Sequence, residues 1–315
     1  MENEYLRKIL KFLNQPFPKE NITIADEGYN NKVFLMNDLD IAIKIIKKSE
    51  ENAKNEMNVL NYINEKINIP IPIIKHSDFS RKIIPHPFVV MNIVPGFTLK
   101  KHVKSNKANT EIFYELGKIK GKINSIKNID YGGFKENKID NYQEVLHNEW
   151  NKIKLKLNMS ELNKEFIIEQ DNFFNKNLNL TKNDVGPCLV HGDTSLNNIL
   201  IKDGKISGIL DFEYAHWGCG IQDLFSSIRG FNVFFSNKKE LIKGYSEYIE
   251  TPREWEKLMY FYQWFANIKA LSQIGKMFWR DLNKEDTNER KKTLRETYIL
   301  NCKKYIKAFY DINIS

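Results

Sequence analysis

Cysteine is scarce in this chain, and its three cysteines lie far apart. Cys188, Cys219 and Cys302 are odd in number and form no C-x-x-C pair. Disulfide frameworks use an even number of cysteines, and zinc cages use closely paired ones. The sequence therefore excludes a disulfide-stapled miniprotein and argues against a cysteine metal cage.

Long apolar runs are also missing. No segment reaches the roughly 20 apolar residues that span a bilayer. The start of the chain, MENEYLRKILKFL, is too charged for a secretory signal. We therefore expect a soluble, cytoplasmic protein that uses no membrane.

The positive charge of the chain has no local concentration. The formal net charge is +8, with 41 lysines and only 7 arginines. Residues 1–99, 100–210 and 211–315 carry +1, +4 and +3, so no segment holds the excess. Arginine is the preferred partner of phosphate and guanine, because its planar guanidinium binds two acceptors at once. The sequence therefore favours a solvated lysine-rich surface over nucleic-acid binding, and it implies no obligate protein partner.

The sequence patterns change once along the chain. With 315 residues and 42% hydrophobic residues, the chain can bury a sizeable core. Strand patterns mixed with one helix extend to FVVMNIV (88–94), after which Pro95-Gly96 interrupts them. Helical patterns then prevail, apart from a strand–turn–strand pattern at 189–212. We predict an α+β fold with two lobes, a smaller N-terminal one at 1–94 and a larger, mostly helical one at 95–315.

Two helices are predicted from local signals. Apolar residues recur at three- and four-residue spacing between Glu50 and Lys66, which predicts a helix over that range. Further on, Thr251-Pro252-Arg253-Glu254 combines the residues of a capping box with a proline at the first helical position. This pattern predicts a helix that Thr251 caps and that begins at Pro252.

The main chemical signal is a set of polar residues in a fixed order. Asp193 ends the triplet His191-Gly192-Asp193, Asn198 follows five residues later, and Asp211 follows 18 residues after Asp193. Phosphoryl transfer needs a carboxylate that takes the proton of the acceptor hydroxyl, and oxygen ligands that hold Mg²⁺ against the nucleotide phosphates. Asp193 suits the first role. Asn198 and Asp211 suit the second, because a loop followed by a hairpin around Asp203-Gly204 returns both to one cleft.

The N-terminal part contains a matching ion pair. Lys44 ends the apolar run Ile41-Ala42-Ile43-Lys44, and Glu56 lies 12 residues later in the predicted helix. A lysine that is fixed by a helix glutamate can neutralise the α- and β-phosphates of a nucleotide. We therefore include Lys44 and Glu56 in the candidate site.

These segments resemble the aminoglycoside phosphotransferase family, the antibiotic kinases of the protein-kinase-like superfamily. The resemblance covers roughly residues 20–230. It implies a bilobal protein-kinase-like fold with ATP or GTP and Mg²⁺ in the cleft. The lobe at 1–94 would bind the nucleotide, and the lobe at 95–315 would be the catalytic and acceptor-binding lobe. The segments that carry the resemblance are VVMNIVPGFTL (89–99), ELGKIKGKINSI (115–126), LVHGDTSLNNIL (189–200) and GILDFEYAHWGCGIQDLF (208–225).

The resemblance also implies a role for individual residues. Backbone groups of Asn92 and Val94 would meet the purine, and Asp223 would be a structural aspartate of the large lobe. The other implied roles agree with those argued above: Asp193 as catalytic base, Asn198 and Asp211 as Mg²⁺ ligands, and Lys44 paired with Glu56.

Three departures from the family pattern stand out. The turn DEGYNN (26–31) has a single glycine, so Asn30 and Asn31 would supply side-chain donors in place of a glycine-rich loop. Residue 213 is glutamate where protein kinases have the glycine of D-F-G. Gly218-Cys219-Gly220 stands where the family often has G-D-P.

The size of the acceptor follows from a short spacing. Only 11 residues separate Asp211 from Asp223, too few for the long activation segment on which protein kinases dock peptides. We therefore expect a small-molecule acceptor and no phosphorylation switch.

The identity of the acceptor stays open between two cationic classes. An aminoglycoside is favoured by the family resemblance, and Asp-Phe-Glu-Tyr also occurs in kinases similar to those of choline, ethanolamine and thiamine. A nucleotide-binding pseudokinase is less favoured, because no base or metal ligand is missing. Both cationic classes need acidic or aromatic walls. The candidate acceptor residues are Glu213, Trp264, Trp279 and Asp281, although rings at helical spacing, such as Trp264, more often belong to the core.

Overall fold

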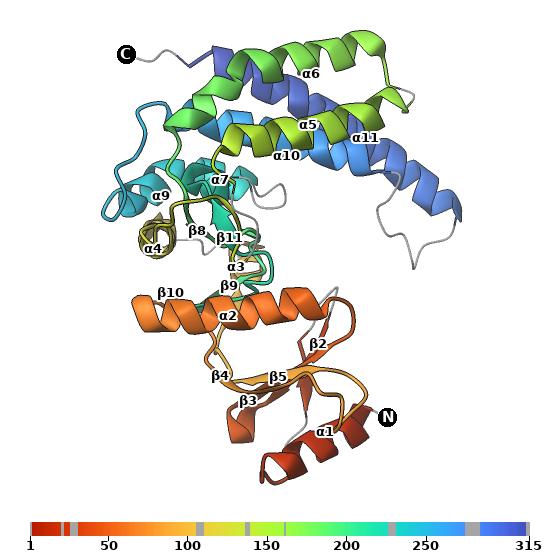
Figure 1. Ribbon diagram of the computed structural model, residues 1–315, viewed down its shortest axis with the longest axis vertical. Helices are drawn as coiled ribbons and strands as arrows, with labels where there is room; N and C mark the ends of the chain where they lie inside the picture. Colours follow the sequence, from red (N-terminus) through yellow and green to blue (C-terminus); the bar gives the residue numbers. More distant parts are fainter. Residues whose placement is uncertain are drawn as a thin grey trace.

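The chain forms two lobes, as the sequence predicts (Figure 1). The smaller lobe is built on a five-stranded sheet, and the larger lobe is mainly helical. The predicted α+β architecture is therefore confirmed. The computed structural model describes residues 2–19, 22–25, 31–104, 110–135, 139–160, 162–225, 231–274 and 284–312.

The small lobe is an antiparallel sheet between two helices, with strand order β1-β2-β3-β5-β4. Figure 1 shows α1 on one face of the sheet and α2 on the other, toward the large lobe. A 3-10 turn, Asn37–Leu39, connects β2 to β3. The elements are α1 (Glu2–Phe12), β1 (Thr23–Ile24), β2 (Asn31–Met36), β3 (Ile41–Ile46), α2 (Glu50–Lys66), β4 (Ile74–Asp78) and β5 (Phe88–Met91).

The alternation of side chains along β3 explains the position of Lys44. Successive side chains of a strand point to opposite faces of the sheet. Ile43 and Ile45 belong to the apolar cluster under α1, together with Leu6 and Ile9. Lys44 therefore points to the face that α2 covers.

Helix α2 has the range that its apolar spacing predicts, Glu50–Lys66. Ser49 caps it, because its hydroxyl accepts a hydrogen bond from the Asn52 N–H at 3.1 Å. Val59 and Leu60 are buried in the large core cluster that continues into the other lobe. Their burial orients α2 so that Glu56 faces the sheet interior, where it is also buried.

The large lobe combines two small sheets with a group of long helices. The predicted boundary at residues 94 and 95 falls between β5 and β6, the first strand of a large-lobe sheet. The sheets have strand orders β10-β9-β6 and β7-β11-β8. The predicted hairpin around Asp203-Gly204 is confirmed as β9 and β10. The strands are β6 (Phe97–Thr98), β7 (Gly132–Gly133), β8 (Cys188–Val190), β9 (Ile199–Lys202), β10 (Lys205–Ile209) and β11 (His216–Gly218).

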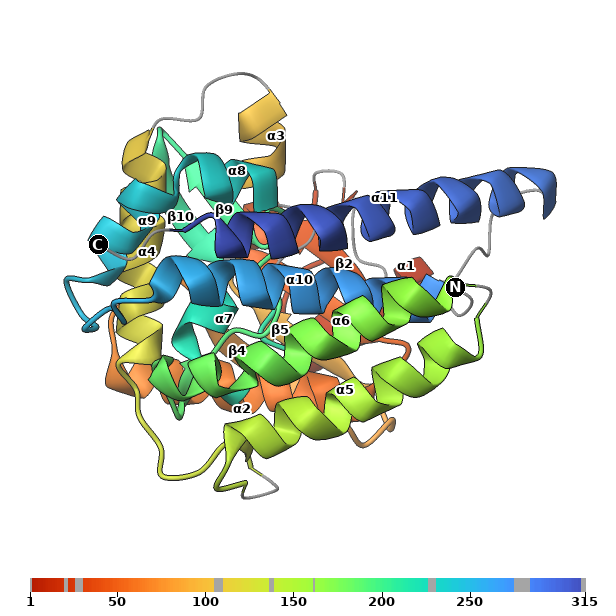
Figure 2. The same ribbon diagram turned by 90° about the horizontal axis from the view of Figure 1, so that it is seen from above.

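Four long helices of the large lobe lie on the side away from the small lobe. Helices α5, α6, α10 and α11 lie alongside one another in this layer (Figures 1 and 2), and α4 packs against α9. No helix of the described residues is both long and apolar enough to cross a bilayer. The helices are α3 (Leu99–Lys104), α4 (Thr110–Asn124), α5 (Tyr142–Asn158), α6 (Lys164–Asn177), the 3-10 segment η2 (Leu178–Asn183), α7 (Gly220–Phe225), α8 (Phe231–Ser236), α9 (Lys238–Tyr245), α10 (Trp255–Gln273) and α11 (Lys284–Tyr310).

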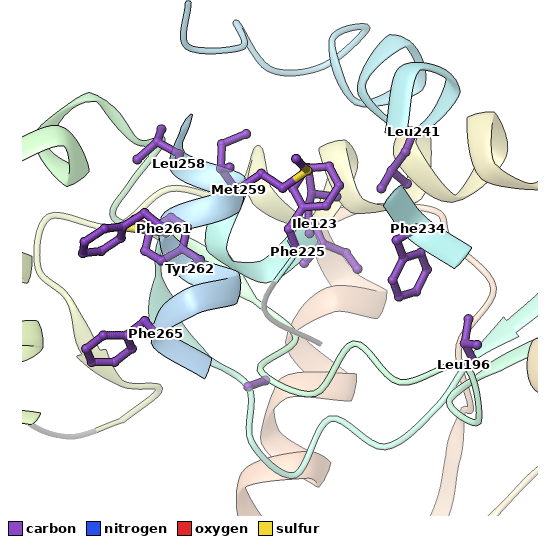
Figure 3. Packing of buried hydrophobic residues seen from close by; sticks show 14 of the residues in the cluster. Ile123, Leu196, Phe225, Phe234, Leu241, Leu258, Met259, Phe261, Tyr262 and Phe265 are labelled. Atoms are coloured by element: carbon purple, nitrogen blue, oxygen red, sulfur yellow. The ribbon is translucent and has the colours of Figure 1, made fainter. Parts of the chain in front are cut away.

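The rings of α10 are mostly core residues. Phe261, Tyr262 and Phe265 are buried, and they belong to the cluster drawn in Figure 3. Trp264 is 0% exposed, its Nε1–H donates to Gln170 Oε1 at 2.7 Å, and its ring packs against Phe173. Burial of these large rings is the main contribution of α10 to stability.

The start of α10 differs from the sequence prediction. The helix begins at Trp255 and not at Pro252. The Thr251 hydroxyl bonds the Ser246 hydroxyl at 2.7 Å and does not cap a helix, and a turn closes between the Trp255 N–H and the Pro252 carbonyl. The capping-box pattern therefore gave the wrong first residue, because a neighbouring loop competes for the threonine.

A buried ion pair connects α4 to α7. Lys120 Nζ lies 2.9 Å from Asp223 Oδ2, with side-chain exposures of 2% and 1%. Lys120 also donates to the Thr194 hydroxyl at 2.8 Å, and that hydroxyl donates to the Asp223 carbonyl at 2.7 Å. A buried ammonium is tolerated only when it is paired and fully hydrogen-bonded.

We predict that Lys120→Met lowers the free energy of unfolding by about 3–5 kcal/mol, because it leaves the Asp223 carboxylate buried without its counter-ion. Chemical denaturation at pH 7 measures this loss. Lys122→Met, on the same helix but partly exposed, is the matched control and is expected to cost under about 1 kcal/mol. Adding Asp223→Asn to Lys120→Met should recover part of the loss, and an unchanged double variant would contradict this account.

Candidate active site

The loop after β8 is held in a conformation that requires glycine. Gly192 has a φ of +80°, and a Cβ atom there would lie 2.2 Å from the Tyr214 carbonyl oxygen. Its N–H donates to Asp223 Oδ1 at 3.0 Å. Asp223 also binds Lys120 and accepts a hydrogen bond from the Thr194 hydroxyl at its carbonyl. Asp223 therefore holds Gly192 and Thr194, the residues on either side of Asp193.

Asp193 and Asn198 are linked directly. Asn198 Nδ2 donates to the Asp193 carboxylate oxygen Oδ2 and to the Asp193 carbonyl, both at 3.1 Å. The Asn198 N–H donates to the Ser195 carbonyl at 3.0 Å, which closes the turn between them. Because the amide nitrogen of Asn198 is committed to Asp193, the amide oxygen is the atom that can bind a cation.

His191 connects this loop to the segment that carries Asp211. Its Nε2 lies 2.8 Å from the Leu210 carbonyl, and the Asp193 N–H donates to its Nδ1 at 3.2 Å. These partners require the neutral tautomer with hydrogen on Nε2. Burial, with a contribution from nearby Lys120, lowers the pKa of His191 to about 4.

Asp211 adopts a backbone conformation that is unusual for a residue with a side chain. Its φ is +66°, in the left-handed region. Such a residue persists only where its neighbours hold it, at a cost of about 1–3 kcal/mol. The Leu210 N–H donates to the Asn198 carbonyl at 2.8 Å, and this bond brings Asp211 beside Asn198.

Lys44 lies between a carboxylate of its own lobe and one of the other lobe. Its Nζ is 2.6 Å from Glu56 Oε2 and 3.5 Å from Asp211 Oδ1. Burial alone would lower the pKa of Lys44, but Glu56 and Asp211 outweigh it and raise the pKa above its ordinary value. Lys44 is therefore a fixed positive charge at the face of the small lobe.

The carboxylates around Lys44 carry more negative charge than its single ammonium can neutralise, so a second cation could bind there. Glu56, Asp211 and Glu213 all act electrostatically on this one ammonium. The described residues contain no group of three or more histidine, cysteine, aspartate and glutamate side chains arranged as a metal cage. Mg²⁺ is usually bound by one or two protein oxygens together with substrate phosphates. An amide oxygen from Asn198 and the Asp211 carboxylate, which is 37% exposed, fit that requirement.

Asn92 and Val94 lie in the segment that connects the two lobes. The Asn92 N–H donates to the Ile73 carbonyl at 3.2 Å, and its Oδ1 accepts from the Ile73 N–H at 2.7 Å. Val94 packs over Gly208, where a Cβ atom would lie 2.3 Å from Val94 Cγ1. Within the described part of the chain, neither the Asn92 carbonyl nor the Val94 N–H has a hydrogen-bond partner. These two groups can therefore pair with an outside ligand.

The candidate acceptor residues differ in burial, and two of them lie outside the described residues. Glu213 is buried at 6% exposure beside Lys44, whereas the next residue, Tyr214, is 47% exposed. Trp264 lies in the helical core, so the acceptor site proposed below does not use it. Trp279, Asp281 and residues 26–30 of the DEGYNN turn lie outside the described residues.

Three positioning residues were missed in the sequence. Lys120 occupies an apolar position of α4, one turn after Leu116, and a charge at such a position is a signal of a buried partner. Thr194 directly follows Asp193, the predicted base. Asn55 precedes Glu56 on α2, and its Nδ2 donates to the carbonyls of Glu213 and Ala215. No local pattern singles out Thr194 or Asn55.

We predict that His191 makes the protein sensitive to acid. The ordinary histidine pKa is about 6.5, so the unfolded chain binds a proton below that pH while folded His191 stays neutral down to about pH 4. Stability is therefore lost as pH falls from about 6.5 to 4, by about 3 kcal/mol in total. His191→Gln keeps an Nε2 donor and should remove this part of the pH dependence.

Denaturation curves at several pH values measure this effect. The exposed His147 provides the control, and His147→Gln should retain the wild-type pH dependence. Equal pH dependence in His191→Gln and the wild type would contradict the prediction.

Comparison with known proteins identifies the family of this chain. The model of the phosphotransferase enzyme family matches residues 21–261, most of the chain. No curated protein sequence matches.

Solved structures share the fold over nearly the whole chain. One similar structure is the aminoglycoside phosphotransferase APH(2'')-IIIa in complex with GDP and kanamycin, with a TM-score of 0.69, 14% identity and coverage of 94% of this chain and 98% of that one. Another is the ternary complex of streptomycin, ATP and APH(2'')-IIa, with a TM-score of 0.63, 17% identity and coverage of 94% and 97%.

A third similar structure carries a different family description. It is a choline/ethanolamine kinase family protein from Mesorhizobium loti, with a TM-score of 0.69, 14% identity and coverage of 97% of this chain and 94% of that one. At such identities the structural likeness establishes the kinase-like fold, and the family match establishes the class of reaction. The chain therefore belongs to the phosphotransferase enzyme family and is a phosphotransferase that acts on small-molecule hydroxyl groups.

Proposed function

We propose that this protein transfers the γ-phosphate of ATP or GTP to a hydroxyl of an aminoglycoside-type acceptor, with Asp193 as the base. One observation carries the proposal. Asp193 is hydrogen-bonded to Asn198, and Asp211 lies within 3.5 Å of Lys44 from the opposite lobe. Together with the hydrogen bond from the Leu210 N–H to the Asn198 carbonyl, these contacts connect the proposed acid–base, metal-binding and phosphate-binding groups.

The roles of the residues follow from their contacts. Asp193 accepts the proton of the acceptor hydroxyl, while Asn198 holds its carboxylate in one orientation. Lys44, kept charged by Glu56, neutralises phosphate oxygens. Asn198 and Asp211 would hold Mg²⁺, which when bound offsets the charge that develops on the phosphates.

The donor base would be bound at the connection between the lobes. The free Asn92 carbonyl can accept a hydrogen bond from a purine, and the free Val94 N–H can donate one. These two groups suit either purine. The similar structures include one with ATP and one with GDP, so the donor proposal covers both nucleotides.

The acceptor is proposed to be cationic. Glu213 and the partly exposed Tyr214 lie two and three residues after Asp211. Glu213 acts electrostatically on Lys44, and the carboxylates of Glu213, Asp211 and Asp193 act on Tyr214. A carboxylate and an accessible ring suit an amine or a quaternary ammonium. Aminoglycosides are the first class, because two of the three similar structures contain one.

A cationic alcohol such as choline or ethanolamine is the second class, favoured by the Mesorhizobium loti structure and by the exposed Tyr214 ring. A ring and a neighbouring carboxylate both attract a small ammonium group. The two classes differ in which acceptors support turnover, so one acceptor panel separates them.

We predict release of nucleoside diphosphate when the protein is mixed with Mg-ATP or Mg-GTP and an acceptor from either class. Asp193→Asn should lower kcat by about 10²–10⁴-fold with little change in the KM for nucleotide, because general-base catalysis has that magnitude. Asp203→Asn is the matched control, since Asp203 is exposed in the β9–β10 turn and asparagine tolerates its φ of +50°.

The outcomes of this experiment separate the alternatives. Turnover on aminoglycosides supports the first acceptor class, and turnover on choline or ethanolamine alone supports the second. Tight nucleotide binding without turnover on any acceptor would instead indicate a pseudokinase. Full activity of Asp193→Asn would refute the assignment of the base.

A further inference from the structure

Asn55 forms a direct connection between the two lobes at the active site. Its Nδ2 donates to the Glu213 carbonyl at 3.2 Å and to the Ala215 carbonyl at 2.9 Å. Asn55 belongs to α2 of the small lobe, whereas Glu213 and Ala215 belong to the large lobe. One side chain thus uses both amide hydrogens to hold the backbone of the facing lobe.

The held backbone is the turn that immediately follows Asp211. The Ala215 N–H donates to the Phe212 carbonyl at 3.1 Å, which closes this turn. On the other side of Asp211, His191 is hydrogen-bonded to the Leu210 carbonyl at 2.8 Å. Asp211 is therefore fixed from both sides, by the large lobe before it and by the small lobe after it.

This double fixation matters because Asp211 is in the left-handed region, with a φ of +66°. A residue with a Cβ atom returns to a right-handed or extended conformation when its neighbours release it. That change would turn the Asp211 carboxylate away from its present direction beside Lys44 and Asn198. The hydrogen bonds on each side are the contacts that oppose it.

Helix α2 reaches Asp211 by a second route. Glu56, the residue after Asn55, binds Lys44 at 2.6 Å, and Lys44 lies 3.5 Å from Asp211. Successive residues of one helix therefore act on the side chain of Asp211 through Lys44, and on its backbone through the following turn. A shift of α2 would disturb both contacts together.

We propose that Asn55 is a positioning residue that couples the position of α2 to the orientation of Asp211, and so to the affinity of the site for Mg²⁺ with nucleotide. The proposal rests on the proposed function, in which Asp211 holds Mg²⁺. It assigns to Asn55 a role that depends on its two donor hydrogens. Leucine has a similar size but no donor, and aspartate replaces the donor with a carboxylate.

The test measures binding and not turnover. Calorimetric titration with ADP, with and without Mg²⁺, gives the gain in ADP affinity that Mg²⁺ provides. In Asn55→Leu and Asn55→Asp this gain should fall about tenfold, as expected for the loss of one or two hydrogen bonds. The affinity for ADP without Mg²⁺ should be unchanged, because the purine and Lys44 contacts remain.

Two further variants complete the experiment. Asn61→Leu, at an exposed position of the same helix, should retain the wild-type gain from Mg²⁺. Asp211→Asn should lose the gain entirely, which calibrates the effect of losing the carboxylate.

The results distinguish this proposal from the proposed function. A wild-type gain that Asn55→Leu retains in full would overturn the role of Asn55 alone. Equal weakening of ADP binding with and without Mg²⁺ would also overturn it, because that pattern indicates a merely structural contact. A wild-type protein that gains no affinity from Mg²⁺ would overturn the proposed function and this proposal together.

Discussion

Two buried lysines, one in each lobe, hold the carboxylates of the cleft in their positions. Lys44 is paired with Glu56 in the small lobe, and Lys120 is paired with Asp223 in the large lobe. Burying an ammonium group is costly, and the cost is recovered only with close partners and complete hydrogen bonding. Each lysine therefore restricts the surrounding backbone to one arrangement. Lys120 and Asp223 determine the loop of Asp193, and Lys44 meets Asp211 across the cleft.

The backbone of the candidate site adopts uncommon conformations at two positions. Gly192 and Asp211 both have positive φ, and each is held by hydrogen bonds from residues far away in the sequence. Asp223 holds Gly192, while His191 and Asn55 hold the segments on each side of Asp211. These contacts explain how two acidic loops remain adjacent despite the repulsion between their carboxylates. The site is thus preorganised by neutral donors and by buried ion pairs, in addition to the contacts that its proposed reacting groups make with one another.

Local signals predicted the parts of the fold that local contacts determine. The range of α2 follows from its apolar spacing, and the β9–β10 hairpin follows from Asp203-Gly204 between two apolar strands. The start of α10 was wrong, because Thr251 bonds Ser246 in a neighbouring loop. The order Asp193, Asn198, Asp211 identified the candidate site, but not the residues that hold it. Lys120 lies 103 residues from Asp223 and Asn55 lies 160 from Ala215, and single-sequence patterns carry no information about such pairs.

The overall charge of the chain is opposite in sign to that of the candidate site. The net charge is +8, distributed along the whole sequence. In the cleft, however, Glu56, Asp211 and Glu213 act on the single ammonium of Lys44, and Asp193 and Asp211 both act on the neighbouring Tyr214. Carboxylates thus outnumber the buried cation, and Mg²⁺ with a nucleotide would not remove the excess, because the negative charge of the phosphates exceeds that of the metal. A cationic acceptor meets a locally negative site on a positive protein, so its recognition must depend on short-range contacts beside Asp193 and not on long-range attraction.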